Sequence, residues 1–243
     1  MIPSTSHPAL IEYPERARLG RVVPKNRIAL AAHSSSRVRE QLTTHVAKII
    51  WQFKLARETL NLHGSKAVPE IQVFTLALKA TGINDALPVE LLKYIDQAIG
   101  FPIIFELTAS REDGASHEAI RVAATYKRPS EADPGKWVTG DYFATDWLSA
   151  VAPRAPLPVS LDLTRLYEQL IRQLIPVQAR PGELLTSLLE RQRRIASMQR
   201  ECHRLKARIQ REKQFNRKVS LNRQFRELKT ELEALENIIQ RRT

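Results

Sequence analysis

A strand, helix, strand pattern between residues 70 and 108 limits this chain to a small set of folds. Residues 70–79 are dense in β-branched and aromatic side chains with apolar positions on both faces, which predicts a strand covered on both sides. Pro88 suits a first helical turn, and apolar residues then recur at helical spacing until Gly100. Residues 101–108 predict a second strand, so this order favours a right-handed parallel crossover.

Two further strands extend the predicted sheet. Residues 119–127 alternate, which predicts a strand antiparallel to its predecessor with Arg121, Thr125 and Lys127 on a wetter face. An aromatic-rich strand follows at 137–147. We therefore predict an α/β (α+β) domain with a mixed β-sheet. It spans residues 37–177 and ends with a helix at about 161–175.

The segment before this domain lacks a sustained hydrophobic period. Residues 1–36 are rich in Pro, Ser, Arg and Ala, and we interpret them as an extended N-terminal arm. From Arg37 the apolar residues recur at helical spacing, which predicts one helix with a buried face. The residues that carry this period are Leu42, Val46, Ile49, Ile50 and Phe53.

The C-terminal region, residues 183–243, predicts an α-helical coiled-coil hairpin after a hinge at residues 180–182. Apolar residues recur there in three- and four-residue steps. The first seam comprises Leu188, Ile195, Met198, Cys202, Leu205 and Ile209, and the second comprises Phe225, Leu228, Leu232, Leu235 and Ile239. The two seams are out of phase, which predicts a turn around residues 216–222. One long helix with an irregular segment is the alternative.

Positive charge is concentrated in this helical region. The chain has a formal net charge of +12, and residues 191–226 hold 13 basic residues against Glu201 and Glu212. Such a field attracts polyanions without any reaction chemistry. We therefore predict that the region binds nucleic acid or an acidic protein partner. The candidate residues are Arg200, Arg204, Lys206, Arg208, Arg211, Lys213, Phe215, Arg217 and Lys218.

Composition and spacing argue against several other classes of protein. The lone Cys202, a start without a secretory signal and the lack of a long apolar run predict a cytoplasmic protein outside the membrane. No two of the six histidines fall two, three or four residues apart, so we expect no metal site and no cofactor. The Gly-x-Ser-x-Gly turn of serine hydrolases and the phosphate loop of nucleotide hydrolases are also missing.

A divergent magnesium-dependent nuclease is the enzymatic alternative. Carboxylates on adjacent strands can hold magnesium, and the candidates are Glu70, Glu106 and Glu118, with Lys127 as the polarising base. A restriction-type nuclease carries an acid two residues before its lysine, whereas Thr125 stands at that position here. We therefore expect no catalytic residues.

Several phrases, taken in order, give the chain a family resemblance. They are residues 23–26 (VPKN), 49–55 (IIWQFKL), 70–74 (EIQVF), 126–129 (YKRP), 142–143 (YF), 146–147 (DW), 166–170 (LYEQL), 180–183 (RPGE), 212–219 (EKQFNRKV) and 221–222 (LN). On these phrases the chain resembles the bacterial domain of unknown function 4391 family over nearly its full length.

The resemblance implies relatives that are encoded beside helicases and DNA methyltransferases in restriction-like or phage-defence clusters. It supplies no catalytic residue. We therefore expect a non-catalytic accessory subunit of a bacterial DNA-processing system, whose basic helices contact DNA or a helicase or methyltransferase encoded nearby. An autonomous nucleic-acid-binding protein is an alternative, and the C-terminal helices could also mediate homo-oligomerisation.

Overall fold

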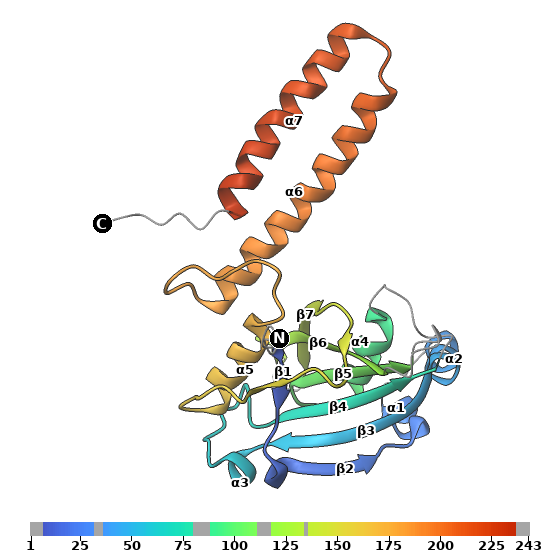
Figure 1. Cartoon of the computed structure of the whole chain (residues 1–243), viewed down its shortest axis with the longest axis vertical. Helices are drawn as coiled ribbons and strands as arrows, with labels where there is room; N and C mark the ends of the chain where they lie inside the picture. Colours follow the sequence, from blue (N-terminus) through green and yellow to red (C-terminus); the bar gives the residue numbers. More distant parts are fainter. Residues whose placement is uncertain (1–6, 32–35, 80–87, 111–117, 134–135, 237–243) are drawn as a thin grey trace, which may run out of the picture. The chain divides into compact units, whose positions relative to one another are not determined.

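The computed structural model describes residues 7–31, 36–79, 88–110, 118–133 and 136–236 (Figure 1). The chain divides into two compact units. The first comprises residues 1–174 and the second residues 175–243. In the part of the chain described, no helix is long and apolar enough to span a bilayer.

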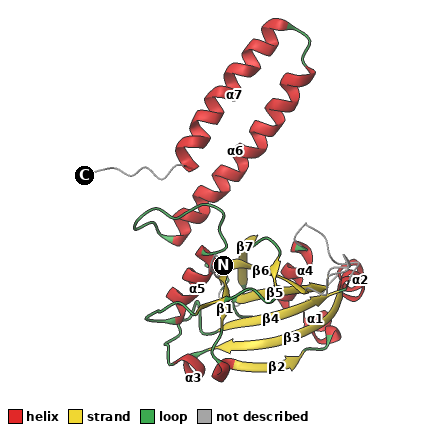
Figure 2. Cartoon of the chain, viewed as in Figure 1, coloured by secondary structure: helices red, strands yellow, loops and turns green. Residues whose placement is uncertain are grey.

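A seven-stranded mixed sheet forms the centre of the first unit (Figure 2). Its order is β2-β3-β4-β5-β6-β7, and β8 also pairs with β6. The strands are β2 (Arg18–Val22), β3 (Val46–Leu55), β4 (Ile71–Leu78), β5 (Ile103–Ser110), β6 (Glu118–Pro129), β7 (Trp137–Ala144) and β8 (Leu148–Ser149). Strands β4 and β5 run parallel and are connected through α4 (Val89–Ala98), whereas β5 and β6 are antiparallel. The predicted strand, helix, strand unit and the mixed sheet are therefore confirmed.

Helices cover one face of this sheet with apolar side chains. The covering helices are α1 (Lys25–Ala31), α2 (Ser36–His45) and α4. Their Ile28, Leu42 and Leu92 join Leu76 and Phe105 of the strands in one buried cluster. Burying each such side chain contributes roughly 1.5 to 3 kcal/mol, so this layer is a main source of stability.

Other elements pack against the opposite face. Helix α5 (Leu163–Arg172) lays the buried Tyr167 ring against Tyr126 of β6, with ring centroids 5.9 Å apart. Strands β1 (His7–Glu12) and β9 (Arg154–Pro156) form a separate parallel pair. The sheet is thus covered on both sides, as its near-continuous apolar strands require.

Residues 1–36 were predicted to form an extended arm, but their described part contributes regular elements to the first unit. These elements are β1, the short 3₁₀ helix Glu15–Ala17, β2 and α1. Strand β2 pairs antiparallel with β3 and so belongs to the central sheet. Tyr13, between β1 and the 3₁₀ helix, is buried with its ring 5.0 Å from that of Phe53.

The helix predicted from Arg37 through Phe53 is wrong in its second half. Helix α2 ends at His45, and β3 begins at Val46 and pairs with β2 and β4. The apolar spacing fits both periods, and the β-branched and aromatic content of residues 46–53 favours a strand. A short helix, α3 (Arg57–Leu60), then follows, and Asn61 ends it in the left-handed conformation with φ of 57°.

The wetter face predicted for β6 is also wrong. Thr125 and Lys127 are each only 1% exposed, because α4 packs over that side of the strand. Arg121 is half-buried, and its guanidinium lies 6.0 Å from the centre of the Trp147 ring.

The second unit consists mainly of two helices, α6 (Leu185–Arg211) and α7 (Phe215–Glu236), which lie side by side and antiparallel (Figure 1). Their side chains meet through the Arg194–Glu231 ion pair and a 2.9 Å hydrogen bond from Gln199 to Glu236. The turn is at residues 212–214, so the turn predicted at 216–222 is wrong. The alternative prediction of one long helix is wrong as well. Glu212 leaves helical geometry at ψ of 125°, and its carboxylate accepts a 2.8 Å hydrogen bond from the backbone N–H of Gln214.

Candidate functional site

The nine residues predicted for binding gather at one end of the helical pair. They occupy the last three turns of α6, the connecting segment and the first turn of α7. All nine are exposed. The structure therefore brings together a set that spans 19 residues of sequence, from Arg200 to Lys218.

Four arginines of this set form a stripe along α6. Arg200, Arg204, Arg208 and Arg211 follow one another at intervals of four, four and three residues, which places them on one face of a helix. Helical periodicity puts this face opposite the one that carries the buried Cys202 and Leu205. The stripe extends over roughly 16 Å at about 1.5 Å per residue. We call these four residues the arginine stripe.

Most of this charge is not neutralised within the described residues. In those ranges, Arg204 alone among the eight cationic candidates forms an ion pair, and its partner is Glu201 on the same helix at 3.5 Å. Their side chains are 73% and 47% exposed, so the pair contributes little to stability. Three other cations of the two helices are matched: Arg194 pairs with Glu231, Arg223 with Glu227 and Lys229 with Glu233. Unmatched positive charge is therefore dense over residues 200–218, on both sides of the turn.

The base of the helical pair holds an ion pair that the sequence did not reveal. Arg191 is 7% exposed and makes two hydrogen bonds to Glu183, of 2.8 and 2.7 Å. The same guanidinium donates to the backbone oxygens of Gln178 and Leu235 at 2.8 and 3.2 Å. These hydrogen bonds from Arg191 hold the pKa of Glu183 down at about 2. Arg191 thus joins the hinge segment to the end of α7 and does not add to the free positive field.

The four nuclease candidates do not converge. The β5–β6 register places Phe105 opposite Ala123 and Glu106 opposite Val122. Lys127 lies four residues beyond Ala123, so it shares the sheet face of Phe105 and not that of Glu106. The Glu106 carboxylate instead pairs with Arg154 at 2.7 Å, and Glu118 is exposed at the start of β6.

The Lys127 ammonium is enclosed by α4 and β7. It donates to the Asp96 carboxylate at 3.3 Å and to the backbone oxygens of Asp96 and Ile99, and it lies 5.7 Å from the centre of the Trp137 ring. Tyr142 donates to the other Asp96 carboxylate oxygen. Burial raises the pKa of Asp96 to about 6 against the opposing influence of Lys127, and burial lowers the pKa of Lys127. Lys127 and Asp96 are each only 1% exposed, so this cluster is closed off from solvent.

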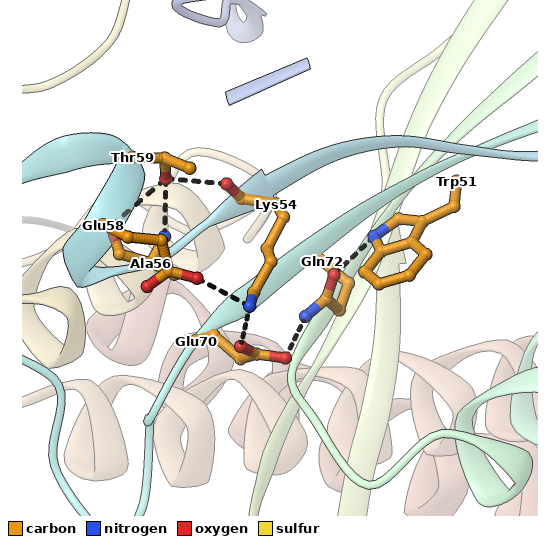
Figure 3. Close-up of polar contacts among 7 residues, drawn as sticks. All are labelled: Trp51, Lys54, Ala56, Glu58, Thr59, Glu70 and Gln72. Carbon is orange, nitrogen blue, oxygen red and sulfur yellow. Dashed lines mark hydrogen bonds and ion pairs between the residues drawn. The ribbon is translucent and has the colours of Figure 1, made fainter. Parts of the chain in front are cut away.

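Glu70 belongs to a series of hydrogen-bonded and ion-paired side chains that crosses strands β3 and β4 (Figure 3). Lys54 lies between the carboxylates of Glu58 and Glu70, at 2.7 and 3.0 Å. Gln72 donates to Glu70 at 2.6 Å and accepts from the Trp51 ring N–H at 2.5 Å. The sequence phrases at 49–55 and 70–74 therefore meet on adjacent antiparallel strands. These contacts connect α3 to the sheet, and both carboxylate oxygens of Glu70 are occupied by Lys54 and Gln72.

No cluster of possible metal ligands is found in the described ranges. Within them, no three side chains of His, Cys, Asp or Glu lie close enough together to hold an ion.

Comparison with known proteins identifies a family only. The family model described as "Domain of unknown function (DUF4391)" matches residues 11–232, which confirms the resemblance seen in the sequence phrases. No curated protein and no solved structure matches the chain.

Proposed function

The chain belongs to the DUF4391 family, a domain of unknown function, and from that premise we propose that it is a non-catalytic accessory subunit of a bacterial DNA-processing system. In this proposal, the helical pair is a coiled-coil hairpin that binds the phosphate backbone of DNA through the arginine stripe. The first unit binds a protein partner, such as a helicase or a DNA methyltransferase of a phage-defence cluster.

The observation that carries the proposal is the arginine stripe itself. Guanidinium groups present planar pairs of N–H donors that match phosphate oxygens, and each phosphate neutralised releases condensed counterions. Like charges four residues apart on a helix repel one another, which costs roughly 0.2 to 0.5 kcal/mol per pair. A bound polyanion relieves that repulsion along the whole stripe.

The apolar seams support the coiled-coil part of the proposal. Ile195, Met198, Cys202 and Leu205 are buried at three- and four-residue steps along α6. On α7, Leu221 is buried, whereas Phe225 and Leu228 are half-buried. A seam of this period is typical of helices that pack together lengthwise. The half-buried side chains of α7 leave apolar surface through which a second copy could associate.

The positions and partners of the nuclease candidates support the non-catalytic part of the proposal. Lys127 is buried and Glu106 is paired with Arg154 on the opposite sheet face. The two side chains therefore cannot act together on one scissile phosphate. A binding role needs no such convergence.

Salt dependence of DNA binding tests the proposal. We expect the slope of log K against log salt to be flattened by roughly 3 to 4 when the arginine stripe is replaced by Gln, because each phosphate contact contributes about 0.9. The matched control replaces Arg18, Lys93, Arg128 and Lys136 with Gln. This control removes the same formal charge from exposed ion pairs of the first unit, and its slope should equal that of the parent. Equal slopes in both variants would contradict the proposal.

Copurification separates an accessory subunit from an autonomous DNA-binding protein. The tagged full chain is isolated from cells that express its neighbouring genes, with and without nuclease treatment. A subunit retains a helicase or methyltransferase after the DNA is digested. An autonomous DNA-binding protein retains neither.

A further inference from the structure

Two large apolar side chains stand exposed beside the turn of the helical pair. Phe215 is 79% exposed and Val219 is 52% exposed. They lie four residues apart on α7, which places them on one side of the helix. We call this pair the apolar tip.

The apolar tip lies among the unmatched cations of residues 200–218. Arg211 and Lys213 precede Phe215, and Arg217 and Lys218 follow it. In the part of the chain the structure describes, none of these four cations has a carboxylate partner, as the ion pairs of α6 and α7 lie elsewhere. The carboxylate of Glu212 is engaged by the backbone N–H of Gln214 at 2.8 Å.

The composition of this surface specifies the chemistry of its occupant. An exposed aromatic ring accepts a flat apolar face, and the surrounding cations require negative charge on the same molecule. An unpaired nucleotide carries both, because its base has a π-face and its phosphate is anionic. A paired base does not expose that face.

We propose that the apolar tip binds unpaired nucleotides where a duplex ends, with the Phe215 ring stacked on a base and Lys213, Arg217 and Lys218 on the flanking phosphates. This inference rests on the proposed function, since the arginine stripe would hold the adjoining duplex. Arg211 is the last residue of the stripe and precedes Phe215 by four residues, so the two surfaces adjoin along the chain. The substrate class is therefore a duplex with a single-stranded extension.

Fluorescence anisotropy with two labelled DNAs tests the inference. One is a blunt duplex of about 20 base pairs, and the other is the same duplex with an extension of about six nucleotides. We expect the extension to tighten binding by the full chain roughly tenfold. Phe215→Ala should lose that advantage and keep its affinity for the blunt duplex within about twofold, since the arginine stripe is intact.

A base analogue separates stacking from simple apolar contact. 2-Aminopurine at the first unpaired position should be quenched by the parent chain and not by Phe215→Leu, which keeps the apolar surface but lacks the ring. Leu161→Ala is the matched control, because Leu161 is another large apolar residue that is 83% exposed, in the first unit. That variant should behave like the parent chain in both assays.

The outcomes distinguish this inference from the proposed function. If the parent binds blunt duplex but gains nothing from the extension, or if Phe215→Ala keeps the gain, the inference is overturned and the proposed function stands. If neither DNA binds, the proposed function fails and the inference fails with it. If Phe215→Ala weakens binding of a labelled acidic peptide rich in leucine and leaves the DNA affinities unchanged, the tip serves a protein partner and the inference is overturned.

Discussion

Arg191 and Glu183 form a two-point ion pair in which Nε donates to one carboxylate oxygen at 2.8 Å and Nη2 to the other at 2.7 Å. The pair is nearly buried, with side chains 6% and 10% exposed. Because Arg191 also reaches the backbone oxygen of Leu235, a residue at the start of α6 holds the end of α7. The geometry of the helical pair, and with it the direction of the arginine stripe, depends on this contact.

Replacing Glu183 with Gln should loosen the base of the helical pair. The change leaves the Arg191 guanidinium without its carboxylate, which costs roughly 1.5 to 3 kcal/mol for a hydrogen-bonded charge. Amide hydrogen exchange should accelerate in α6 and α7 and stay unchanged in the central sheet. Glu227→Gln is the control, because its pair with Arg223 is exposed at 63% and 82% and should contribute little. Equal protection in parent and Glu183→Gln would contradict the role given to this pair.

Low pH should weaken the same ion pair between Arg191 and Glu183, because it protonates the carboxylate. The pKa of Glu183 is about 2 in the folded chain, against an ordinary value of 4.5. A depressed carboxyl pKa contributes stability that is present above the ordinary value and is lost as the pH falls through the folded value. We therefore expect the helical pair to lose stability progressively between pH 4.5 and about 2. Thermal unfolding followed by far-UV circular dichroism measures this loss, and Glu183→Gln should show a smaller one.

The buried pair of Asp96 and Lys127 predicts a pH dependence of opposite sign. The pKa of Asp96 rises from 3.8 to about 6 because of burial, so the folded chain takes up this proton more readily than the unfolded chain. Stability from this group is fully present below pH 3.8 and is lost as the pH rises through about 6. Urea denaturation of the parent and of Asp96→Asn across this range should isolate the contribution, because the variant cannot titrate there.

Removing the Lys127 ammonium should destabilise the first unit strongly. Lys127→Met leaves the Asp96 carboxylate buried without its cation, which costs roughly 3 to 5 kcal/mol near neutral pH. Adding Asp96→Leu should restore part of the loss, since both buried charges are then gone. Lys93→Met on the same helix is the control, because its pair with Glu90 is 43% and 73% exposed. A loss in Lys93→Met as large as that in Lys127→Met would refute this account.

Local periodicity predicted the elements whose apolar residues fit one pattern only. Strands β4 and β5 were predicted because their residues are apolar on both faces. Helix α4 was predicted because apolar residues recur at helical spacing between Pro88 and Gly100. The boundary at His45 was missed because no Gly or Pro separates α2 from β3, and Ile49 and Phe53 satisfy both periods. Pairing with β2 and β4, which local sequence does not encode, decides the conformation there.

Long-range pairing explains what sequence reasoning missed in the candidate sites. Lys127 alternates with apolar neighbours like a surface residue, but its partner Asp96 lies 31 residues before it, and Tyr142, which donates to the same carboxylate, lies 15 residues after it. Arg191 belongs to the basic segment, but Glu183, eight residues before it and directly after the left-handed Gly182 (φ of 72°), neutralises its charge, and its further partner Leu235 lies 44 residues away. The arginine stripe was accessible from sequence because its spacing is local to one helix.

Substitution of Glu106 distinguishes a structural role of its carboxylate from a catalytic one. Its carboxylate accepts from Arg154 at 2.7 and 3.3 Å, and Arg154 also donates to the Ile11 backbone oxygen, so this contact joins β5 to β9 and β1. Glu106→Gln should therefore lower the free energy of unfolding by roughly 1.5 to 3 kcal/mol in urea denaturation. Glu118→Gln, at an exposed carboxylate, should leave it unchanged. A metal-binding carboxylate behaves differently, because its removal abolishes magnesium-dependent DNA cleavage while stability is kept or increased. Cleavage by the parent that disappears in a fully stable Glu106→Gln would replace the structural role with a catalytic one.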